Sequence, residues 1–217
     1  MRSPRFRDRA HAGSLLARAV IPRIHERANA VVLALPRGGV PVASPVATLL
    51  RAPLDLFLVR KLGLPGEEEV AIGAIASGGI RVLNDRVIAE CGIDEATIEL
   101  ITRREQQEIE RRGLAYRGDR PPIDLVDRTI VLVDDGLATG ATMRAAVTAL
   151  RSQKPAAIIV AVPVGSREAC EALGHAADDL ICLETPEPFI AVGNWYEDFS
   201  QTSDEEVRRV LHAYHQE

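Results

Sequence analysis

The chain has 217 residues, 47% of them hydrophobic and 26% charged, so it is long enough to bury a sizeable core and is not disordered by composition. Its net charge of −5 weighs against a protein that holds nucleic acid mainly through the phosphates. No apolar run approaches the ~20 residues of a membrane-spanning helix, and the basic N-terminus is not followed by the apolar stretch of a secretory signal. Because the three cysteines also show no CxxC spacing, we expect a cytoplasmic protein with no membrane partner.

Segments of helix-like and strand-like character alternate along the chain, which is the pattern of an α/β protein with a mostly parallel sheet. The first half predicts, in order, a helix over residues 8–24, a strand over 30–35, a helix to about 50, a strand over 54–59, a loop over 62–69, a hairpin over 71–83 and a charged helix over 94–116. The second half predicts a linker over 117–127, a strand over 129–133, a helix over 140–152, a strand over 157–162, a helix over 166–173, a strand over 180–183, an irregular tail over 184–199 and a last helix after Ser203.

The most informative segment is residues 130–143, with the sequence IVLVDDGLATGATM. Its apolar strand delivers two carboxylates, Asp134 and Asp135, to the carboxyl edge of the sheet, where open α/β sheets bind ligands. The loop that follows opens a helix, so its backbone N–H groups and hydroxyls can surround a phosphate. The loop residues are Gly136, Leu137, Ala138, Thr139, Gly140, Ala141 and Thr142.

Two acids beside a phosphate cradle would repel the ligand unless it also offers hydroxyls or a divalent cation. A phosphorylated ribose with magnesium provides both. The segment has no Walker A lysine, and its glycines do not fit GxGxxG. The alternative is a plain turn after a core strand.

Residues 131–143 resemble the signature of type I phosphoribosyltransferases. This family has a Rossmann-like parallel sheet flanked by helices, with a small hood. The resemblance implies that residues 136–142 bind the 5-phosphate of phosphoribosyl pyrophosphate (PRPP). It also implies that Asp134 and Asp135 meet the ribose hydroxyls and bind Mg²⁺, directly or through water. Ala138 stands where 6-oxopurine-specific members carry a further acid, so the loop is most similar to the adenine type.

Two other segments match sites of the family. Arg37, Gly38 and Gly39 follow the first core strand, where the family places its pyrophosphate loop. Arg60 and Lys61 end the second strand, and the resemblance implies that these cations face pyrophosphate and act in catalysis with the acid pair. A plain strand–helix turn and ordinary surface cations are the alternatives. Residues 62–69 fall where the family has a flexible lid, in which Glu67, Glu68 and Glu69 are either solvated acids or a proton-transfer group.

We expect one phosphoribosyltransferase domain over residues 1–217, with a core over about 28–184 and a hood built from 1–27 and 185–217. The two ends differ in charge: residues 1–27 have a net charge of +5, and residues 178–217 have −8. Phe189, Trp195 and Tyr196 fall in the predicted hood and could stack on a planar base. Packing inside the hood is the alternative for at least two of them.

The expected reaction moves the phosphoribosyl group of PRPP to a nitrogenous small-molecule acceptor, a nucleobase, with Mg²⁺ and with release of pyrophosphate. The alternative function is a PRPP-binding sensor or regulator of the same fold without catalysis. Arg37, Arg60 and Lys61 favour catalysis, because a sensor does not need groups that stabilise departing pyrophosphate. Family members often associate, so a homodimer is compatible with the resemblance, although no sequence feature decides it.

Overall fold

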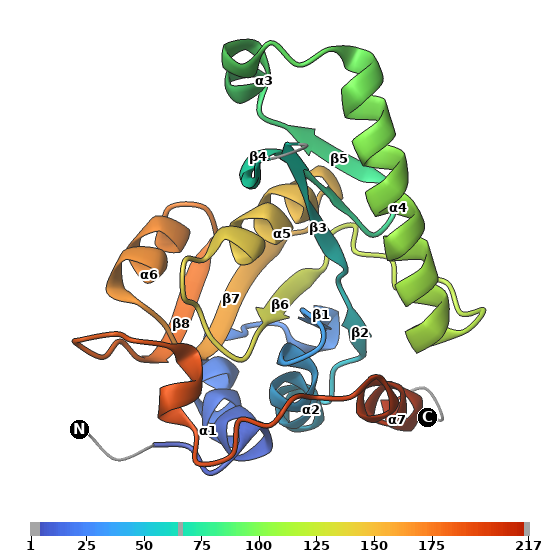
Figure 1. Cartoon of the computed structure of the whole chain (residues 1–217). Helices are drawn as coiled ribbons and strands as arrows, with labels where there is room; N and C mark the ends of the chain where they lie inside the picture. Colours follow the sequence, from blue (N-terminus) through green and yellow to red (C-terminus); the bar gives the residue numbers. More distant parts are fainter. Residues whose placement is uncertain (1–4, 65–66, 215–217) are drawn as a thin grey trace.

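A five-stranded parallel sheet forms the centre of the computed structural model, which describes residues 5–64 and 67–214, with the backbone alone for residues 67–70 (Figure 1). The strand order is β2-β1-β6-β7-β8. All neighbours in this sheet pair in parallel. The strands are β1 (Ala30–Ala34), β2 (Leu54–Leu56), β6 (Thr129–Val133), β7 (Ala157–Val164) and β8 (Asp179–Glu184). The parallel α/β sheet predicted from the sequence is therefore confirmed.

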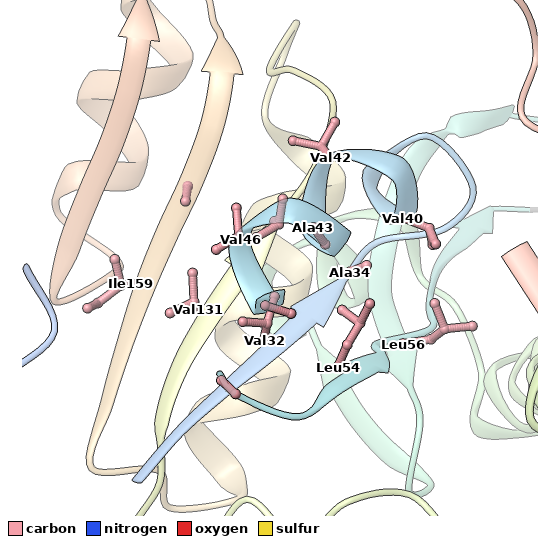
Figure 2. Packing of buried hydrophobic residues seen from close by; sticks show 14 of the residues in the cluster. Val32, Ala34, Val40, Val42, Ala43, Val46, Leu54, Leu56, Val131 and Ile159 are labelled. Carbon is pink, nitrogen blue, oxygen red and sulfur yellow. The ribbon is translucent and has the colours of Figure 1, made fainter. Parts of the chain in front are cut away.

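Apolar residues on both faces of the strands hold the helices on the sheet. Side chains of one face pack with α1 (Arg9–Val20) and α2 (Gly39–Leu50), and those of the other pack with α5 (Ala141–Ser152) and α6 (Arg167–Gly174). Figure 2 shows Val46 of α2 close to Val32 and Val131 of the sheet. Full burial of such a side chain is worth about 1.5–3 kcal/mol. Because β1 and β6 pair in parallel between these layers, their carboxyl ends lie at one edge of the sheet.

A second, antiparallel sheet contains β3 (Val59–Leu64), β4 (Glu67–Ala76) and β5 (Ile80–Leu83). The prediction of a single strand over 54–59 and a loop over 62–69 was wrong. β2 ends at Leu56, and a new strand, β3, begins at Val59. Residues 62–64 are part of β3, in which Leu62 is fully buried and pairs with Gly73 of β4. Residues 65–66 and the side chains of Glu67, Glu68 and Glu69 lie outside the described part, so the role of these glutamates remains a prediction.

The remaining helices are α3 (Asp85–Cys91), which the sequence analysis did not predict, α4 (Glu95–Arg117) and α7 (Asp204–Tyr214). Asp94 accepts a hydrogen bond from the Thr97 N–H and so begins α4 where expected. In Figure 1, α7 lies near the lower end of α4, and the two helices are in contact. None of the helices between residues 5 and 214, outside the gap at 65–66, is both long and apolar enough to cross a bilayer.

The N-terminal segment lies beside the tail that follows β8. The N–H of Phe6 donates to the Trp195 carbonyl at 3.0 Å, and the N–H of Glu197 donates to the Phe6 carbonyl at 2.8 Å. In contrast, α1 lies within the predicted hood range but packs on the central sheet. The division into a core and a hood remains a prediction, and residues 1–4 and 215–217 of the hood lie outside the described part.

Candidate functional site

The acid pair follows β6 at the carboxyl edge of the central sheet. Oδ1 of Asp134 accepts a hydrogen bond from the Asp135 N–H at 2.8 Å. Burial raises the pKa of Asp134 well above its ordinary value, and the negative charge of Asp135 adds to this effect. The structure thus holds a carboxyl group at this edge that is costly to ionise without a ligand.

Asp135 is held by residues from both ends of the chain. Nε of Arg9 donates to Oδ2 of Asp135 at 2.8 Å, and the two side chains are only 11% and 17% exposed. The hydroxyl of Tyr196 donates to the Asp135 carbonyl at 2.6 Å. Sequence reasoning missed Arg9, since the only signal was the excess of arginine near the N-terminus. These contacts fix both the backbone and the carboxylate of Asp135.

The predicted pyrophosphate turn lies directly against the acid pair. A Cβ on Gly38 would lie 2.0 Å from Oδ2 of Asp135, and one on Gly39 would lie 2.7 Å from the Val133 carbonyl oxygen. The Leu35 N–H donates to that same carbonyl at 2.9 Å. The Pro36–Arg37 peptide in this turn is cis. Only glycine therefore lets the turn approach the end of β6 this closely.

Arg37 points from this turn toward α7. Its Nη1 lies 3.4 Å from Oδ1 of Asp204, which also accepts a hydrogen bond from the Tyr116 hydroxyl at 2.8 Å. Burial raises the pKa of Tyr116, and the hydrogen bond to Asp204 raises it further. The tyrosine hydroxyl likewise lowers the pKa of Asp204. Arg37 thus has an acidic partner from the C-terminal helix that the sequence did not suggest.

The predicted phosphate loop is anchored where it leaves the acid pair. The Leu137 N–H donates to the Val164 carbonyl at 2.9 Å. The Ser166 hydroxyl donates to the Ala138 carbonyl at 2.7 Å. A Cβ on Gly136 would lie 2.5 Å from Cγ1 of Val192, so the C-terminal tail packs on the loop. The loop is consequently held by β7, by the residue that caps α6 and by the tail.

The second half of the loop is open to solvent. Thr139, Ala141 and Thr142 are exposed, and Gly140 has a φ of 70°, a left-handed conformation that favours glycine. Gly140 is also the N-cap of α5, whose first N–H groups lack intrahelical partners. The loop therefore presents hydroxyls and first-turn amides at the positive end of a helix, as an anion site requires. The Ala141 N–H donates to Oγ1 of Thr139 at 3.4 Å, so a bound anion would replace this contact.

Arg60 and Lys61 do not end the second strand, as predicted, but lie within β3 of the second sheet, where they border a large cleft. Nε of Arg60 donates to Oε2 of Glu105 at 2.7 Å, and Lys61 is exposed. A cleft of about 910 Å³ runs between the second sheet, α4 and α5, and its lining includes Arg60, Lys61, Arg144 and Thr142. The lining also includes Arg104 and the acid Glu105, so its net charge is positive and favours anionic ligands.

A second, smaller hollow of about 30 Å³, the size of about one water molecule, lies where parts of the predicted subsites approach one another. Its lining includes Pro36 from the pyrophosphate turn, Arg60 from β3 and Thr142 from the phosphate loop. Three segments that are far apart in the sequence therefore meet around one space.

The predicted aromatic residues lie in the packed region formed by the two chain ends. Tyr196 is 4% exposed, and its ring centre is 5.3 Å from that of Phe6 and 5.0 Å from that of Phe199. Phe189 and Trp195 are half-buried and pack against the same cluster. This placement favours a packing role for Tyr196. Base binding by the three residues remains a prediction.

The acid pair fits Mg²⁺ only as part of a coordination sphere. Within the described portion of the chain, no three acidic, histidine or cysteine side chains gather to hold a metal ion by themselves. Mg²⁺ is commonly held by one or two carboxylates together with substrate phosphates and water. Asp134 and Asp135 suit that arrangement, since the raised pKa of Asp134 shows that its charge needs a counter-ion.

The family model described as a phosphoribosyl transferase domain matches residues 10–197. This chain belongs to the phosphoribosyltransferase family. It is 44% identical over 212 residues to proteins of two Mycobacterium tuberculosis strains that carry the name "Putative phosphoribosyl transferase". The match covers 98% of this chain but 47% of those proteins, so the chain spans about half the length of these curated relatives.

Solved structures show the same fold. The crystal structure of TT1426 from Thermus thermophilus is 44% identical and superposes with a TM-score of 0.88, over 97% of this chain and 99% of that one. A Neisseria gonorrhoeae protein with bound ppGpp is 14% identical and has a TM-score of 0.50, over 98% of both chains. The second likeness concerns the fold alone.

Proposed function

We propose that the protein is a phosphoribosyltransferase that moves the phosphoribosyl group of PRPP to a nitrogenous acceptor, a nucleobase, and releases pyrophosphate. The observation that carries this proposal is the close approach of two segments at one edge: the glycine turn after β1 lies against the acid pair, which leads directly into the open loop before α5. Family membership supports the transferase class.

The loop over residues 136–142 binds the 5-phosphate in this proposal. Its exposed Thr139 and Thr142 hydroxyls and the amides of the first turn of α5 donate hydrogen bonds to the phosphate oxygens. Asp134 and Asp135 accept hydrogen bonds from the ribose hydroxyls, which offset the cost of holding two acids beside a phosphate. This arrangement orients the sugar rather than reacting with it.

Pyrophosphate lies against the turn and the cations of β3. The amides of Gly38 and Gly39 approach it closely, and Arg37, Arg60 and Lys61 stabilise the negative charge that develops as it departs. Arg37 and Arg60 are paired with Asp204 and Glu105. In this proposal, the phosphates of PRPP compete with these two carboxylates for the guanidinium groups.

The reaction breaks the bond between the anomeric carbon and the pyrophosphate oxygen, which keeps the electron pair. The acceptor nitrogen forms the new bond to this carbon and releases a proton. Mg²⁺, held by Asp134 and Asp135 together with the substrate, would supply positive charge that neutralises the phosphates.

The test is a panel of nucleobases and other nitrogenous acceptors incubated with the protein, PRPP and Mg²⁺, with pyrophosphate release as the signal. Turnover with at least one acceptor supports the proposal, and Asp135→Asn should abolish it. PRPP binding without turnover across a broad panel would favour the sensor function. Homodimerisation and a cytoplasmic location remain predictions, and the first is tested by light scattering in solution.

A further inference from the structure

Arg9 connects the acid pair to the tail that follows β8. Besides the bond to Asp135, its Nη1 donates to the Ser200 carbonyl at 2.7 Å, and its guanidinium carbon lies 3.9 Å from the centre of the Phe199 ring. The side chain is 11% exposed. A planar guanidinium held at three points has little rotational freedom.

The carboxylate that Arg9 holds lies at the junction of two predicted subsites. Oδ2 of Asp135 accepts the Arg9 hydrogen bond and also lies against Gly38 of the pyrophosphate turn. Because one oxygen is fixed in this way, the direction of the second oxygen is fixed too. The charge of Arg9 also offsets the repulsion between the acid pair and an incoming phosphate.

We propose that Arg9 is a positioning residue for PRPP, which acts through Asp135 and does not touch the substrate. This inference rests on the proposed function, because it assigns a role within the same site. The proposed positioning role of Arg9 differs from a purely structural role in the property that a substitution changes. A structural residue changes the stability of the protein, whereas Arg9 changes the affinity for PRPP in a way that depends on the carboxylate of Asp135.

The first experiment measures PRPP affinity by calorimetry in the presence of Mg²⁺, together with the melting temperature. Arg9→Ala should weaken PRPP binding by about 10- to 100-fold, as expected for loss of a hydrogen bond to a charged group. Arg9→Lys should recover part of this loss, because it keeps the charge but cannot reach Asp135 and Ser200 together. Arg18→Ala is the matched control, since Arg18 is an exposed arginine on the same helix, and it should bind like the wild type.

A double-mutant cycle with Asp135→Asn then tests the route of the effect. If Arg9 acts through Asp135, adding Arg9→Ala to Asp135→Asn should cause almost no further loss of affinity. Should Arg9→Ala prevent folding, Phe199→Leu removes the ring beneath the guanidinium and should give a smaller loss in the same direction.

Three results would overturn the inference. Unchanged affinity in Arg9→Ala would show that the ion pair does not position the acid. A full, additive loss in the double variant would show that Arg9 acts elsewhere. Wild-type protein that binds no PRPP at all would overturn the proposed function and this inference together, whereas wild-type binding with either of the first two results would overturn the inference alone.

Discussion

Substitution of Gly38 by alanine tests the close approach of the turn and the acid pair. Gly38 has a φ of −60° and a ψ of −33°, a conformation that alanine adopts freely, so any cost is steric. The added Cβ would lie 2.0 Å from Oδ2 and 2.6 Å from Cγ of Asp135, and real Cβ atoms essentially never come within 3.0 Å of another heavy atom. The carboxylate must therefore move by at least 1.0 Å, which breaks its 2.8 Å bond to Arg9.

We expect Gly38→Ala to lower the free energy of unfolding by about 2–4 kcal/mol, from overpacking and the lost charged hydrogen bond. Urea unfolding followed by the fluorescence of Trp195, the single tryptophan, measures this change. Gly174→Ala is the control, because nothing lies within 4 Å of its added Cβ at the end of α6. It should be neutral or stabilise by up to about 1 kcal/mol. Equal stability of the two variants, with equal affinity for PRPP, would refute the reasoning.

Three further substitutions test other parts of the account. Asp134→Asn should stabilise the protein at pH 7 while it weakens PRPP binding. Burial raises the pKa of Asp134 in the folded state, so this group lowers wild-type stability as pH rises from its unfolded pKa toward its folded pKa. Urea titrations at pH 4 and 7 should therefore show the stability of the wild type falling relative to that of Asp134→Asn, and an equal change in both would contradict the assigned burial. Burial raises the pKa of Tyr196 well above its ordinary value. Above about pH 10, the stability of the wild type should therefore fall more steeply than that of Tyr196→Phe, by up to about 1.4 kcal/mol per pH unit. Equal slopes would contradict the assigned burial. Arg117→Ala leaves the buried carboxylate of Asp55 without its 2.6 Å partner and should cost about 3–5 kcal/mol in chemical denaturation, where a loss below about 1 kcal/mol would count against the pair.

The parallel sheet was predictable because its strands are short apolar runs that are buried on both faces. Residues 129–133 show this directly: alternate side chains enter the two apolar layers, and all of them are hydrophobic after Thr129. The second sheet was harder to predict. Gly63, Pro65 and Gly66 resemble a loop in sequence, whereas the antiparallel pairing of Leu62 with Gly73 makes the flanking residues strands. Tertiary pairing overrode local composition there.

The acid pair and the phosphate loop were also predictable, because consecutive residues carry the whole pattern. The residues that pair with the acid pair and with the pyrophosphate turn could not be predicted. Arg9 and Asp135 are separated by 126 positions, and Arg37 and Asp204 by 167. Only the fold brings such residues together, and patterns of local sequence spacing cannot predict contacts over these separations. The opposite net charges of residues 1–27 and 178–217 were compatible with the two segments lying near each other, but they did not indicate which residues would be in contact.

Amide hydrogen exchange with and without PRPP and Mg²⁺ tests the central claim most directly. The account predicts that the ligand slows exchange in peptides that cover residues 36–39 and 134–142, and that this protection is weaker in Asp135→Asn at the same ligand concentration. Protection confined to other segments, or none at saturating PRPP, would contradict the claim that this edge of the sheet binds the sugar phosphate.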